Sequence, residues 1–144
     1  MIRNITPTIR FIGVDDPELD LFESQYVVPE GMSYNSYLIL DEKVAILDTA
    51  DGRKGDAWKA HLAEALEGRT PDYLVVHHME PDHSSLVAEM LEKYPSLTLV
   101  YMLLSLRKEL FLWENILPTS NALISLRNGE YLGSQLRRSP IKMV

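Results

Sequence analysis

The feature that most constrains this chain is a short apolar segment followed at once by a cluster of potential metal ligands. Residues 72–76 read DYLVV, a pattern typical of a strand that is buried within a sheet. Five side chains able to bind a metal then fall within seven residues: His77, His78, Glu80, Asp82 and His83. Open α/β sheets place their sites in loops at the carboxyl ends of strands. The segment therefore predicts a metal site at one edge of a sheet.

The remaining pattern predicts an α/β fold in which helices alternate with apolar strands. Residues 32–40 and 44–47 are expected to form a hairpin, and residues 97–101 a further buried strand. Apolar residues repeat at helical spacing over residues 54–67, where Trp58 and Leu62 share one face, and residues 85–94 are expected to form a second helix. Residues 102–117 could continue as a helix, and residues 122–132 as a strand, turn and strand.

Composition excludes several classes of protein and suggests a boundary near residue 100. The chain has 144 residues, no cysteine and a net charge of −7, so thiolate metal sites and a general nucleic-acid surface are not expected. No apolar run is long enough to span a membrane, and no signal peptide is apparent, so we expect a cytoplasmic location. Residues 1–100 carry a net charge of −10 and residues 101–144 a net charge of +3. We therefore expect a domain over 1–100 and a divergent tail of unclear fold over 101–144.

The ligand-rich loop could also be ordinary solvated surface, but its position after a buried strand favours a metal site. In an extended loop, His78, Glu80 and Asp82 would point to the same side and could converge on metal ions. Imidazole and carboxylate ligands suit iron, zinc or manganese. His77 would point the other way and is expected to pack or to support a ligand. Asp48, at the end of residues 44–48, could accept a hydrogen bond from a ligating histidine.

The pattern His-x-Glu-x-Asp-His, formed by His78, Glu80, Asp82 and His83, resembles the metal-binding signature of the flavodiiron proteins. Most hydrolases of the metallo-β-lactamase fold have histidine where this chain has Glu80. The segments GMSYNSYLIL at 31–40 and VAILDT at 44–49 also resemble the family's first hairpin. The resemblance covers about residues 1–100 and implies the N-terminal part of a metallo-β-lactamase-like αββα sandwich.

The resemblance implies a function as well as a fold. His78 and Glu80 would bind one iron of a non-haem di-iron site, and Asp82 the other, with His83 as a ligand or close neighbour. Such enzymes reduce dioxygen to water or nitric oxide to nitrous oxide. A redox donor such as rubredoxin supplies the electrons, which pass through a flavin mononucleotide (FMN). These enzymes form homodimers. No catalytic residue beyond the metal ligands, and no cofactor-binding residue, is expected in this chain.

This sequence departs from the family's pattern in its second half. The family's site needs a further aspartate and two further histidines, but no histidine follows His83 and no aspartate follows Asp82. A flavodoxin-like domain for the FMN is also missing from these residues. We therefore expect a truncated chain with an incomplete site. Two alternatives stay open, a zinc hydrolase of the same fold and a non-catalytic fragment or interaction module.

Overall fold

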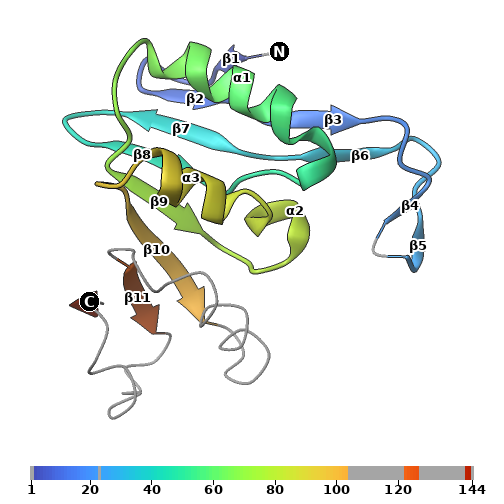
Figure 1. Ribbon diagram of the computed structural model, residues 1–144. Coiled ribbons are helices and arrows are strands. Elements are labelled where there is room, and N and C mark those ends of the chain that lie inside the picture. Colours follow the sequence, from blue (N-terminus) through green and yellow to red (C-terminus); the bar gives the residue numbers. More distant parts are fainter. Residues whose placement is uncertain (1, 23, 104–121, 127–141, 144) are drawn as a thin grey trace.

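The computed structural model describes residues 2–22, 24–103, 122–126 and 142–143. Within these residues the main feature is one mixed eight-stranded sheet (Figure 1). Its strands, in spatial order, are β1 (Arg3–Asn4), β2 (Ile9–Phe11), β7 (Tyr37–Leu40), β8 (Val44–Leu47), β9 (Tyr73–Val76), β10 (Thr98–Leu103), β11 (Ala122–Leu126) and β12 (Lys142–Met143). The α/β class expected from the sequence is confirmed.

Strand direction changes at β8, and this change positions the site. Strands β7 and β8 form the expected antiparallel hairpin, in which Leu38 lies opposite Ile46. From β8 onward the strands run parallel, with Leu47 opposite Val75 on β9. The first crossover contains η1 (Gly52–Lys54) and α1 (Gly55–Leu66), and the second contains α2 (Pro81–Ser84) and α3 (Val87–Lys93). Because β8 and β9 are parallel neighbours, the loops at their carboxyl ends meet at the same edge.

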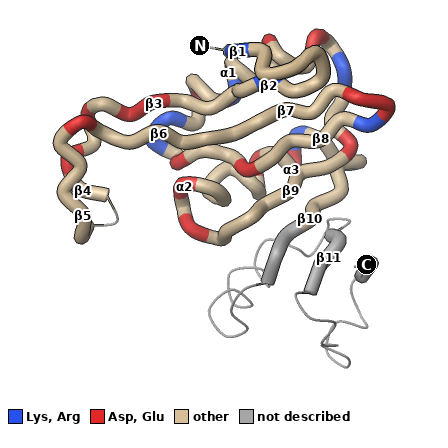
Figure 2. The backbone as a smooth tube through the Cα atoms, turned by 180° about the vertical axis from the view of Figure 1, so that it is seen from behind, with Lys and Arg blue, Asp and Glu red and all other residues tan. Residues whose placement is uncertain are grey.

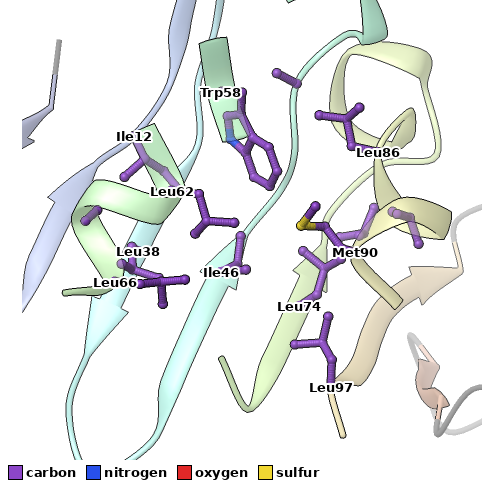
Figure 3. Packing of buried hydrophobic residues seen from close by; sticks show 14 of the residues in the cluster. Ile12, Leu38, Ile46, Trp58, Leu62, Leu66, Leu74, Leu86, Met90 and Leu97 are labelled. Carbon is purple, nitrogen blue, oxygen red and sulfur yellow. The ribbon is translucent and has the colours of Figure 1, made fainter. Parts of the chain in front are cut away.

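Helices α1 and α3 cover one face of the sheet and form the core with it (Figure 3). Trp58 and Leu62 of α1 point at the strands, and Met90 of α3 fills the space beside Leu74 of β9. All four side chains are at most 1% exposed. Burial of a side chain of this size stabilises the fold by about 1.5–3 kcal/mol. The helical spacing seen in the sequence therefore corresponds to one continuous apolar interface.

The opposite face of the sheet is also apolar but is only half-buried. Figure 2 views the sheet from this side, with α1 and α3 behind it. Exposure alternates along β8, where Val44 and Ile46 are buried against the helices. The half-buried side chains of the second face come from four neighbouring strands: Ile9, Tyr37, Ile39, Ala45, Leu47 and Val75. A sheet that is apolar on both faces is typical of a layer inside a larger assembly.

A two-stranded arm extends from the sheet beyond β2 and β7 (Figure 1). It is formed by β3 (Val14–Asp16) with β6 (Met32–Tyr34), and then by β4 (Leu21–Phe22) with β5 (Tyr26–Val27). Asp16 is the last residue of β3, and its fully buried carboxylate lies 3.0 Å from Arg53 Nε and 3.3 Å from Lys54 Nζ. These ion pairs fasten the arm to η1.

The secondary structure expected from the sequence is confirmed in most of its elements. Helix α1 confirms the helix expected over 54–67, and α3 is shorter than the helix expected over 85–94. Met102 and Leu103 end strand β10 rather than beginning a helix, while residues 104–117 and 127–132 lie outside the described residues. No helix in the described part of the chain is long and apolar enough to cross a membrane.

Candidate metal centre

The site is built where the carboxyl ends of two parallel strands meet. Asp48 follows β8 directly, and His77 follows β9 directly. The two loops are joined at the strand ends, because the Asp48 backbone N–H donates to the Val75 carbonyl at 2.8 Å. The sheet register therefore brings Asp48 beside the ligand-rich loop, although 29 residues separate it from His77 in the sequence.

Asp48 is held in an unusual backbone conformation that aims its carboxylate at this loop. Its φ of 56° lies in the left-handed region, and its carbonyl accepts a hydrogen bond from Ser36 Oγ at 2.9 Å. Oδ1 accepts from the His77 backbone N–H at 2.7 Å, and Oδ2 lies 2.8 Å from His77 Nδ1. Burial raises the pKa of Asp48. The hydrogen bonds and charges of His83 and His77 lower it by more, so the net shift is downward. Asp48 is thus a buried carboxylate kept ionised by two imidazoles.

The sequence predicted an extended ligand-rich loop, but the structure is extended only as far as Glu80. Residues Pro81–Ser84 form the short helix α2, which begins at a proline and follows an extended Glu80. Proline is favoured at the first helical position because its missing N–H needs no partner there. The Thr49 N–H and Oγ both donate to the His83 carbonyl, at 2.9 and 2.8 Å. The loop after β8 therefore fixes the end of α2.

The short helix brings three of the expected ligands together. Glu80, Asp82 and His83 each offer a ligand atom, and these atoms all lie within 4.8 Å of one another. His83 Nε2 is 3.3 Å from Asp82 Oδ2. His78 lies beside this group, with Nδ1 3.7 Å from Glu80 Oε2. The four residues of the sequence motif therefore share one small region, with His78 at its margin.

The donor set fits a hard or borderline divalent cation. Asp82 Oδ1 is buried without a hydrogen-bond partner, so one carboxylate oxygen is free to bind. Burial raises the pKa of Asp82, and the neighbouring Asp48 carboxylate raises the pKa of His83. A bound cation would offset the desolvation of Asp82 and satisfy its oxygen. Two carboxylates and imidazole suit iron, manganese or zinc.

The other residues singled out in the sequence have structural contacts. Asp48 does reach a histidine of the motif, because its Oδ2 lies 3.1 Å from His83 Nδ1. His77 faces Asp48, with its Nδ1 2.8 Å from the Asp48 Oδ2. Sequence reasoning missed Thr49 and Ser36, which position the loops. Their only signal was the run of small polar residues around strands β7 and β8.

These features define a class of protein before any comparison is made. A mixed sheet with helices on one face, and a histidine–carboxylate loop after a parallel strand, match the metallo-β-lactamase-like fold. The flavodiiron protein of Giardia intestinalis superposes with a TM-score of 0.74 at 22% identity, covering 97% of this chain and 36% of that chain. The rubredoxin oxygen:oxidoreductase of Desulfovibrio gigas has a TM-score of 0.65 at 25% identity, covering 69% of this chain and 25% of that one.

Sequence comparison narrows the class to one family. The diflavin flavoprotein A 1 of Thermosynechococcus vestitus is 36% identical over 99 residues, which are 69% of this chain and 17% of the relative. The anaerobic nitric oxide reductase flavorubredoxin of Vibrio vulnificus is 33% identical over 97 residues, 67% of this chain and 20% of the relative. No protein-family model matches the chain. This chain belongs to the flavodiiron protein family and spans only about a fifth of the length of these two relatives.

Proposed function

We propose that this chain carries the iron-binding loop of an oxidoreductase that reduces dioxygen to water or nitric oxide to nitrous oxide. The observation that supports this most directly is the convergence of Glu80, Asp82 and His83 within 4.8 Å, with a buried and unpartnered oxygen on Asp82. A glutamate in the middle of the motif adds a hard, anionic ligand, which suits iron better than a histidine would.

The residues would share the metals as the family resemblance implies. His78 and Glu80 would hold one iron, while Asp82, with His83 beside it, would hold the other. Iron held by these residues would pass electrons from the redox donor to the gaseous substrate. The chain's own contribution is to orient the ligands: Thr49 Oγ holds the His83 carbonyl, and the Asp48 carboxylate lies 3.1 Å from the His83 ring. FMN, a redox donor such as rubredoxin and a homodimeric partner belong to the same proposal.

Metal analysis after anaerobic expression with iron supplied tests this proposal. We expect iron to co-purify with the chain, and Glu80→Gln and Asp82→Asn to lower its content because each removes an anionic ligand. Lys59→Gln is a matched control, since Lys59 pairs with Glu89 on the surface away from the loop. Iron well below one per chain in the unmodified protein would refute iron binding by this loop. Zinc in place of iron would instead favour the zinc hydrolase.

One observation favours a second candidate, an interaction module. The sheet face across β2, β7, β8 and β9 is formed by half-buried apolar side chains, namely Ile9, Tyr37, Ile39, Ala45, Leu47 and Val75. Large exposed apolar faces mark association sites or aggregation hazards. Under this candidate the chain associates through the sheet, and Leu47→Lys at the centre of the face shifts it to the monomer in light scattering. Monomeric behaviour of the unmodified chain at high concentration would exclude it.

A further inference from the structure

We propose that His77 is a positioning residue that weakens metal binding, because it occupies the Asp48 carboxylate that would otherwise orient His83. The inference rests on the proposed function, since it concerns the affinity of the same site. It assigns to His77 a role that the ligand motif itself does not contain, namely competition between two imidazoles for one buried oxygen.

The contacts of Asp48 are divided unequally between the two histidines. His77 takes both oxygens, with its backbone N–H 2.7 Å from Oδ1 and its Nδ1 2.8 Å from Oδ2. His83 Nδ1 approaches the same Oδ2 at 3.1 Å, but without the alignment of a hydrogen bond. It is a buried nitrogen that has no hydrogen-bond partner. One oxygen therefore serves two rings, and His77 has the better geometry.

This division matters because a ligating imidazole must present a lone pair to the metal. If the proton of His83 stays on Nδ1, Nε2 is free to bind, and Nε2 is the atom that faces Asp82 at 3.3 Å. A well-aligned acceptor for Nδ1–H fixes this tautomer and raises the basicity of the ligand. With His77 on Oδ2, Asp48 supports that tautomer only in part.

His77 can be changed without disturbing the core. Its side chain is 47% exposed, and the backbone N–H that binds Oδ1 remains in any variant except proline. His77→Leu removes the competing ring alone. Asp48→Asn supplies the second half of the test, because asparagine tolerates the left-handed conformation that Asp48 adopts, at φ 56°. His78→Leu is the matched control, since the neighbouring histidine lies beside Glu80 rather than Asp48.

The experiment measures the dissociation constant for Fe²⁺ on the full chain, anaerobically, by competition with a chromophoric chelator. We expect His77→Leu to tighten binding about three- to tenfold, which is less than the roughly 10- to 100-fold effect of a whole supporting partner because Asp48 already lies 3.1 Å from His83. His78→Leu should weaken binding. In the Asp48→Asn background, His77→Leu should change the affinity less than about twofold, because the contested carboxylate is gone.

Imidazole nitrogen chemical shifts of the metal-free chain give a second readout. In His77→Leu, the His83 signals should move toward the form protonated on Nδ1. Weaker or unchanged Fe²⁺ binding in His77→Leu, an equal gain without the Asp48 carboxylate, or unmoved His83 signals would each overturn the proposal. If neither the unmodified chain nor any variant binds Fe²⁺, the proposed function fails, whereas the nitrogen shifts still decide whether His77 displaces His83 from Asp48.

Discussion

Replacement of Thr49 by valine tests whether the loop after β8 holds the ligand helix in place. Thr49 is fully buried, and its Oγ donates to the His83 carbonyl at 2.8 Å while accepting the Leu86 N–H at 3.5 Å. Valine keeps the shape but removes the hydroxyl. The lost bond to His83 costs about 0.5–1.5 kcal/mol, and the buried Leu86 N–H left without an acceptor adds roughly 1 kcal/mol.

The total, about 1.5–2.5 kcal/mol, is measurable by urea denaturation of the metal-free chain. With a slope of about 1.5 kcal/mol per molar urea, the midpoint should fall by roughly 1–1.7 M. Thr49→Ser is the control, because it keeps the hydroxyl and loses only a methyl group worth about 0.8 kcal/mol. If valine destabilises the chain less than serine does, packing of the methyl group rather than the hydrogen bonds fixes this position, and the argument is wrong.

Two further predictions concern the arm and its attachment. Gly31→Ala should lower the free energy of unfolding by more than about 3 kcal/mol, because φ is +80° and a Cβ would lie 2.5 Å from Pro17 Cα. Gly68→Ala is the control. Its φ is +83°, but a Cβ there would meet open space, so it should cost only about 1 kcal/mol. Equal losses in thermal unfolding would contradict this. Burial raises the pKa of Asp16, but its ion pairs with Arg53 and Lys54 bring it below 3.8, so its stabilisation is full above pH 3.8 and disappears as pH falls through the lowered pKa. Asp16→Asn should therefore be less stable than the unmodified chain near pH 7, and the gap should shrink on acidification below pH 3.8; a gap independent of pH would refute an ionic role.

Much of the fold could be predicted because each element has its own periodic signal. Trp58 and Leu62 repeat at helical spacing, and the run around Leu74 is continuously apolar, so helix α1 and strand β9 follow from local pattern. Helix α2 could not be predicted in this way. It has only four residues, and its helical turn depends on Pro81 and on the contacts of Thr49, which are local and tertiary constraints rather than periodicity.

The candidate site was predictable in composition but not in detail. Spacing predicted Glu80 and Asp82, the family resemblance added His83, and the structure brings these three together. The expected alternation of an extended loop placed His78 among them, whereas the helical turn leaves it at the margin. The competition between His77 and His83 depends on the register of β8 against β9, which no single segment of sequence contains.

The backbone conformation of Asp48 shows that the fold itself positions this carboxylate. A non-glycine residue at φ 56° costs of order 1–3 kcal/mol and persists only where surrounding contacts determine it. Its N–H binds Val75, its carbonyl accepts from Ser36, and its carboxylate receives His77. Each of these contacts comes from the chain alone and from strands packed on the α1–α3 core. The fold therefore positions the Asp48 carboxylate, and we expect the affinity for a cation to depend on how His77 and His83 share its oxygens.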